Sequence, residues 1–87
     1  MAKVHLYTTS YCPYCRAAKN LLEQKGVEFE EIDLTYDLEK RKLLVEKHKW
    51  RTVPIIMINE ELIGGYDQLV ELERKNKLDE LLNNTPN

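Results

Sequence analysis

The chain is poor in the residues that mark several classes of protein. Two cysteines among 87 residues are too few for the disulfide scaffold of a small secreted module. The longest apolar run, residues 53–58, is far too short to span a membrane, and the first residues show no signal-peptide pattern. A net charge of -2, with acidic and basic residues interspersed, gives no support for nucleic-acid binding. We therefore expect one cytoplasmic, monomeric domain over residues 1–87, frayed from residue 83, that binds neither membranes nor nucleic acids.

Both cysteines lie in one short motif, Cys12-Pro13-Tyr14-Cys15, between a predicted strand at residues 3–8 and a predicted helix at residues 13–25. Pro13 suits the first helical position, because the N–H that it lacks would have no partner there, and this makes Cys12 the helix N-cap. The sulfur would then face free backbone N–H groups and the positive end of the helix dipole, which favour a thiolate. Such a CxxC motif at a strand-to-helix junction indicates a dithiol redox site. We predict that Cys12 attacks and that Cys15, one turn further in, resolves.

Two other interpretations of the cysteine pair are weaker. A structural zinc site needs four ligands, and the chain has no second cysteine pair and no His-x-x-His pattern, so we expect no metal. A purely structural disulfide across so short a loop would add little stability, because it would restrict the unfolded chain very little.

The remaining sequence predicts an α/β fold with the element order β-α-β-α-β-β-α. Further strands are expected at residues 28–34, 54–58 and 62–63, further helices at residues 37–49 and 67–76, and a last short helical turn at residues 78–82. The glutamate-rich strand at 28–34 suits a sheet edge, and the apolar strand at 54–58 suits the centre. Gly26 would cap the end of the helix at residues 13–25. The helix at residues 37–49 is rich in lysine and glutamate apart from a thin apolar stripe of Leu38, Leu44 and Val45, so we expect it to be mostly solvated. A parallel first pair and an antiparallel closing hairpin would give a mixed four-stranded sheet flanked by three main helices.

Two further motifs come after the helix at residues 37–49. In Thr52-Val53-Pro54, a cis peptide bond before Pro54 would leave the backbone of Val53 free to pair with an extended peptide. An ordinary trans proline that opens a strand is an equal alternative. In Gly64-Gly65-Tyr66-Asp67, the glycines allow close approach of a ligand, and Asp67 lies at a helix N-terminus. Taken alone, Asp67 is better explained as a helix cap.

Together, CPYC, TVP about forty residues later and GG-x-D about ten residues beyond that resemble the glutaredoxins, a branch of the thioredoxin fold. The resemblance runs from Val4 to Leu82 and implies a cis Pro54 and a glutathione-dependent thiol–disulfide oxidoreductase with no permanently bound cofactor. Its substrates would be protein–glutathione mixed disulfides and protein disulfides, with glutathione as co-substrate. The resemblance also implies that Pro13 and Tyr14 support catalysis beside the dithiol, and that glutathione binds in a groove that Tyr14 helps to line. The implied glutathione-binding residues are Arg51, Thr52, Val53, Pro54, Gly65, Tyr66 and Asp67.

One position departs from the family pattern. Many glutaredoxins carry a lysine three residues before the first cysteine, where this chain has Thr9. We expect weaker glutathione binding or a less acidic Cys12 as a result, unless Arg16 or Lys19 compensates. The missing lysine favours an alternative function, that of a glutaredoxin-like electron carrier. Such a carrier would be reduced by a thioredoxin reductase-type enzyme and would serve ribonucleotide reductase. A module that shares a [2Fe–2S] cluster between two chains is a third interpretation, against which Pro13 and Cys15 both count.

Overall fold

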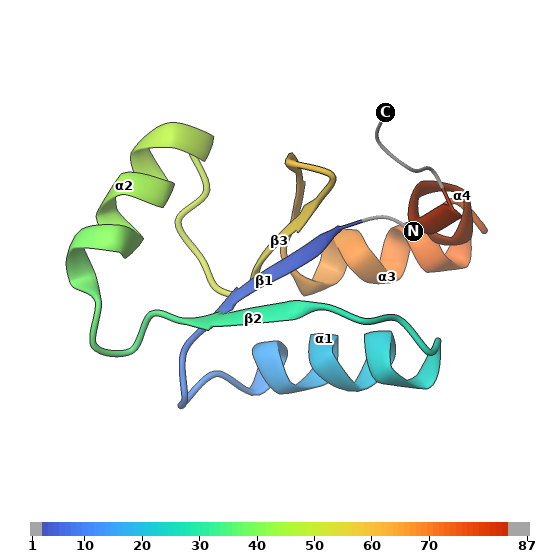
Figure 1. Ribbon diagram of the computed structural model, residues 1–87, viewed down its shortest axis with the longest axis horizontal. Coiled ribbons are helices and arrows are strands. Elements are labelled where there is room, and N and C mark those ends of the chain that lie inside the picture. Colours follow the sequence, from blue (N-terminus) through green and yellow to red (C-terminus); the bar gives the residue numbers. More distant parts are fainter. Residues whose placement is uncertain (1–2, 84–87) are drawn as a thin grey trace.

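The computed structural model describes residues 3–83, which form four strands and four helices (Figure 1). In chain order the elements are β1 (Val4–Thr8), α1 (Pro13–Gln24), β2 (Glu30–Asp33), α2 (Leu38–His48), β3 (Ile55–Ile58), β4 (Glu61–Gly64), α3 (Tyr66–Arg74) and α4 (Leu78–Asn83). The predicted elements are all present, with ends that differ by one or two residues. The expected last helical turn is the short helix α4, which includes Asn83, the first residue of the tail that we expected to fray. Residues 84–87 of that tail lie outside the described residues.

The sheet has the strand order β2-β1-β3-β4. β1 pairs in parallel with β2 and antiparallel with β3, and β3 pairs antiparallel with β4. The predicted mixed sheet is therefore confirmed, and so are the two strand positions. β2 lies at an edge and exposes three of its four side chains, whereas β3 is interior and buries all four.

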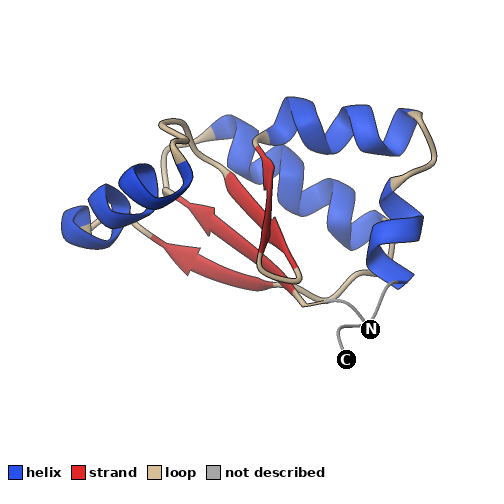
Figure 2. Ribbon diagram, turned by 90° about the horizontal axis from the view of Figure 1, so that it is seen from above, coloured by secondary structure: helices blue, strands red, loops and turns tan. Residues whose placement is uncertain are grey.

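The main core lies between the sheet and the helices α1, α3 and α4. Figure 2 shows α1 and α3 side by side, with α2 standing apart from them. The buried side chains that meet in this core are Val4, Leu6, Ala18, Leu22, Ile56, Ile58, Leu69 and Leu78. Since side chains alternate along a strand, Ile55 and Met57 of β3 face the opposite side of the sheet, where they are also buried.

Helix α2 is mostly solvated, as its lysine-rich sequence predicts. It buries no residue completely, and Leu38, which we expected on its thin apolar stripe, is 72% exposed. Leu44 and Val45 are half-buried and provide the rest of that stripe. The helix begins where the Asp37 carboxylate accepts the N–H of Lys40 at 3.1 Å.

The end of α1 is fixed by backbone hydrogen bonds and by an ion-pair cluster. After α1, Gly26 has a φ of 70°, and the N–H groups of Gly26 and Val27 return to the carbonyls of Glu23 and Leu22 at 3.0 Å each. These two hydrogen bonds satisfy carbonyl groups in the last turn of α1, and the positive φ of Gly26 ends the helix there. Lys25 then binds Glu73 of α3 at 2.9 Å and Asp79 of α4 at 2.8 Å, which holds the three helices together.

No helix within residues 3–83 combines the length and apolar character needed to cross a membrane.

Candidate active site

Cys12 caps the N-terminus of α1, directly after the loop that follows β1. Its backbone is extended, with φ -98° and ψ 111°, and its Sγ accepts the N–H of Cys15 at 3.2 Å. The thiol lies 3.5 Å from the carbonyl oxygen of Val53, to which it can donate. Pro13 occupies the first helical position, as predicted. The arrangement presents a half-exposed sulfur to a helix end, where a negative charge is stabilised.

Cys15 lies one turn further along α1 in a different environment. It is free, and only 1% of its surface is exposed. Burial, with a smaller contribution from the hydrogen bond with Cys12, raises the pKa of the Cys15 thiol from 9.0 to about 12. Cys15 is therefore a protonated thiol at neutral pH, whereas the neighbouring sulfur is open to attack a substrate.

The segment directly before β3, which contains Val53 and Pro54, lies next to Cys12. The Val53–Pro54 peptide bond is cis, which confirms the interpretation favoured by the family resemblance over an ordinary trans proline. Pro54 is buried and Val53 is half-buried. β3 pairs with β1, so the start of β3 lies beside the end of β1, where the dithiol follows.

A hollow of about 280 Å³ adjoins the dithiol. Its lining residues are Tyr14, Trp50, Thr52, Val53, Pro54, Gly65, Tyr66, Asp67 and Gln68. The structure thus brings together most of the residues expected to form a groove, from three separate segments of the chain. The rings of Tyr14 and Tyr66 flank it, with centroids 6.2 Å apart.

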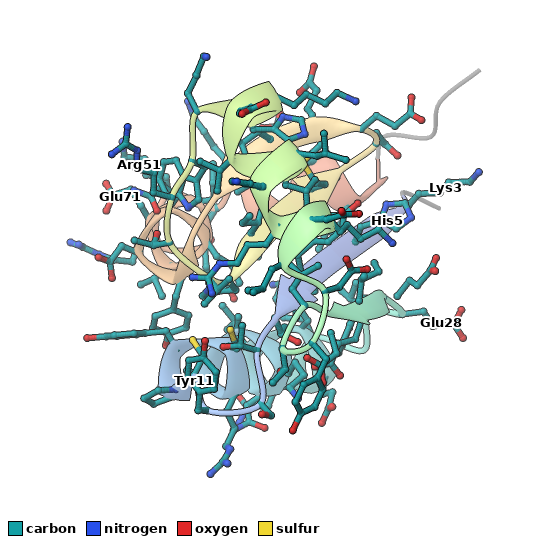
Figure 3. All side chains as sticks on the ribbon, turned by 90° about the vertical axis from the view of Figure 1, so that its left-hand side faces the viewer. Lys3, His5, Tyr11, Glu28, Arg51 and Glu71 are labelled. Carbon is teal, nitrogen blue, oxygen red and sulfur yellow. The ribbon has the colours of Figure 1, made fainter. Side chains whose placement is uncertain are left out.

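Arg51 is the one expected groove residue that does not line this hollow. Its side chain is exposed, and Figure 3 shows it well apart from Tyr11, which lies in the turn before α1. A role for Arg51 towards the far end of a bound ligand stays a prediction.

Trp50 and Gln68 line the hollow although the sequence pattern did not place them there. The Gln68 side chain accepts the N–H of Gly65 at 3.0 Å and so caps α3. A polar residue three positions after an N-cap is a recognisable capping signal, which could have revealed Gln68. For Trp50 the signal is only its place directly before the Arg51-Thr52-Val53-Pro54 segment.

The position of Thr9, where the sequence departs from the expected family pattern, is closed to solvent. Thr9 is 4% exposed, and its Oγ1 has no hydrogen-bond partner within the described residues. Lys19 does not replace that lysine, because its Nζ binds Glu31 of β2 at 3.0 Å. Arg16 is exposed on α1.

A larger hollow of about 840 Å³ lies at the other end of β1, bordered by Lys3, Lys25, Phe29, Glu60 and Asp79 among others. Despite its size, we place the site at the smaller hollow, because the reactive thiol is there and Cys12 follows the opposite end of β1. Within residues 3–83, no cluster of three or more histidine, cysteine, aspartate or glutamate side chains could hold a metal ion.

An N-capping cysteine that faces a cis-proline segment, on a mixed sheet of this order, defines a dithiol oxidoreductase of the thioredoxin fold. Comparison with known proteins narrows this class. The Glutaredoxin family model matches residues 4–63. A glutaredoxin of Pseudomonas aeruginosa is 50% identical over 82 residues, which cover 94% of this chain and 98% of the relative. Glutaredoxin 3 of Escherichia coli is 43% identical over 82 residues, covering 94% of this chain and 99% of the relative.

Solved structures agree with the sequence comparison. The solution structure of a glutaredoxin from Brucella melitensis matches with a TM-score of 0.84 and 45% identity, over 94% of this chain and 89% of that chain. The crystal structure of a buckwheat glutaredoxin–glutathione complex matches with a TM-score of 0.87 and 30% identity, over 93% and 76%. The chain belongs to the glutaredoxin family and is a glutathione-dependent thiol–disulfide oxidoreductase.

Proposed function

We propose that the chain reduces protein–glutathione mixed disulfides through Cys12. The Cys12 thiolate attacks the glutathione sulfur, the protein–glutathione S–S bond breaks, and the protein thiolate leaves and takes up a proton. A second glutathione thiolate then attacks the glutathione sulfur bound to Cys12. This step releases oxidised glutathione and restores the Cys12 thiolate. The observation that carries the proposal is the N-capping Cys12 sulfur, which lies 3.2 Å from the Cys15 backbone nitrogen and 3.5 Å from the carbonyl oxygen of Val53, a residue that lines the hollow.

For protein disulfides we propose a second route that uses both cysteines. Cys12 attacks one sulfur of the substrate and forms a mixed disulfide. Cys15 loses its proton and attacks the Cys12 sulfur, which releases the reduced protein and leaves a Cys12–Cys15 bond. Two glutathione molecules then reduce that bond and become oxidised glutathione. The buried, protonated Cys15 supports this order of events, because a thiol with a raised pKa is a poor first nucleophile.

The hollow is the proposed groove for glutathione. Val53 would pair its backbone with the cysteinyl part, which points the glutathione sulfur at Cys12. The N-terminus of α3 would hold the γ-glutamyl end through the backbone N–H groups of Tyr66 and Asp67 and the Asp67 carboxylate. Thr52 and Tyr14 would form the sides, with Arg51 towards the glycyl carboxylate. The bound tripeptide in the buckwheat relative supports a groove of this kind.

Thiols alone carry the electrons in both routes, so the proposed reaction uses glutathione as co-substrate and needs no resident cofactor. We propose that the chain acts in the cytoplasm, because both routes consume reduced glutathione and the cytosolic glutathione pool is reducing. We also propose that it acts as a monomer, because one chain supplies both cysteines and the whole lining of the hollow.

The function is tested by measuring NADPH consumption with a small glutathione mixed disulfide as substrate. One reaction contains glutathione and glutathione reductase, and the other contains thioredoxin reductase without glutathione. We expect turnover in the first reaction only. Turnover in the second reaction alone would instead favour the electron carrier that serves ribonucleotide reductase.

A further inference from the structure

Trp50, the only tryptophan of the chain, forms part of the wall of the hollow beside Cys12. Its Cζ2 atom lies 3.4 Å from the position that a Cβ on Gly65 would occupy, and the carbonyl oxygen of Pro54 lies 3.6 Å from the same position. The indole edge therefore lies where the segment before β3 meets the start of α3. These two segments are the ones proposed to hold glutathione.

The indole N–H of Trp50 is buried but has no hydrogen-bond partner within residues 3–83. Cζ2 and Nε1 are bonded to the same ring carbon, so the unpaired N–H lies on the indole edge that faces Gly65. A buried donor without an acceptor costs the folded protein free energy, and most native structures avoid it. An acceptor that a ligand brings into the hollow would remove that cost and so strengthen binding.

We propose that Trp50 is a specificity-determining residue of the groove, whose indole N–H donates a hydrogen bond to the carboxylate at the γ-glutamyl end of glutathione. This inference rests on the proposed function, in which glutathione occupies the groove. The γ-glutamyl carboxylate is the acceptor because the start of α3 attracts an anion, and the Trp50 edge lies against Gly65 at that helix end. Because Nε1 itself is closed to water, the proposed hydrogen bond requires the ring to rotate about its side-chain bonds until the N–H reaches the groove surface.

The test is calorimetric titration with S-methylglutathione, which has no free thiol and therefore cannot react with Cys12. Trp50→Phe keeps an aromatic ring and removes the N–H, and we expect it to weaken binding about fivefold to twentyfold. Replacement of Trp50 by β-(3-benzothienyl)alanine, which keeps the bicyclic shape and has a sulfur atom in place of the N–H, should weaken binding as much. Tyr36→Phe removes one polar group from an aromatic residue that is 98% exposed and should leave the affinity unchanged.

A second ligand locates the acceptor. S-methylcysteinylglycine lacks the γ-glutamyl end. Its inhibition constant, measured against turnover of the glutathione mixed disulfide, should therefore be the same for the wild-type protein and Trp50→Phe. Equal loss of affinity for both ligands would overturn the assignment to the γ-glutamyl carboxylate. Unchanged S-methylglutathione binding in Trp50→Phe, or normal binding by the benzothienyl variant, would overturn the role of the N–H. Absence of S-methylglutathione binding by the wild-type protein would overturn the glutathione groove itself, and this inference with it.

Discussion

The two cysteines lie three residues apart but in opposite surroundings, the surface cap of α1 and its buried interior. Cys12 is half-exposed, accepts a backbone N–H and adjoins the hollow, whereas Cys15 is 1% exposed and its pKa is raised to about 12. A single helical turn separates the two environments. The difference shows that position on a helix can give the same side chain two different environments, and it supports the two chemical roles that we propose for the pair.

The largest expected effect is in alkylation of the two thiols. Iodoacetamide at neutral pH should modify Cys12 at least about a hundredfold faster than Cys15, because the thiolate reacts and Cys15 is both protonated and buried. Peptide mapping by mass spectrometry after short exposures measures both rates. Comparable rates for the two thiols would remove the contrast on which the assignment of roles depends.

The buried thiol should also affect stability in alkaline solution. The folded protein keeps the Cys15 proton to a higher pH than the unfolded chain, so unfolding releases that proton between pH 9 and about 12. The free energy of unfolding should therefore fall as pH rises through this window, by at most about 1.4 kcal/mol per pH unit from this group. Urea titrations of the wild-type protein and Cys15→Ala measure the difference, since Cys15→Ala should lack this component. Parallel pH profiles for the two proteins would contradict the raised pKa.

On the exposed side, the charge of Asp67 should contribute to glutathione recognition. Asp67→Asn should raise the KM for a glutathione mixed disulfide about fivefold. The reason is that an exposed ion pair, here between Asp67 and the amino group at the γ-glutamyl end, contributes roughly 1 kcal/mol. Glu71→Gln is the matched control, since it removes the same charge from α3 outside the hollow. An equal rise in KM for both variants would indicate a general charge effect and no specific contact with Asp67.

The smallest effect is expected at Thr9, whose hydroxyl is buried without a partner among residues 3–83. Thr9→Val keeps the shape and removes the unpaired group, so the free energy of unfolding should stay the same or rise by about 1 kcal/mol. Thermal unfolding measures this change, with Thr35→Val as a contrast, because the Thr35 hydroxyl accepts the N–H of Ser10 at 2.8 Å. A clear loss of stability in Thr9→Val would show that its hydroxyl has a partner in solution.

The sequence predicted most of the fold because its local signals agree with each other. Pro13 sets the start of α1 and Gly26 its end, and the apolar run of β3 identifies the strand covered on both faces. Leu38 is the exception. The apolar stripe of a short, highly charged helix predicts a covered Leu38, but α2 buries no residue and leaves this leucine exposed.

The site was less accessible to sequence reasoning, because its wall is assembled from segments far apart in the chain. The cysteine pair is local and was recognised from spacing alone. Trp50 lines the hollow only because the start of β3 and the start of α3 meet there, and that approach depends on tertiary packing. The exposure of Arg51 depends in the same way on how the loop after α2 runs.

The asymmetry of the two cysteines in catalysis is the most direct test of this account. Turnover of a small glutathione mixed disulfide and reduction of a protein disulfide, both driven by glutathione, should be measured for the wild-type protein, Cys12→Ser and Cys15→Ser. Cys12→Ser should lose both activities, and Cys15→Ser should lose protein-disulfide reduction while it keeps turnover of the glutathione mixed disulfide. Loss of both activities in Cys15→Ser, or turnover that survives in Cys12→Ser, would contradict the roles proposed for the two thiols.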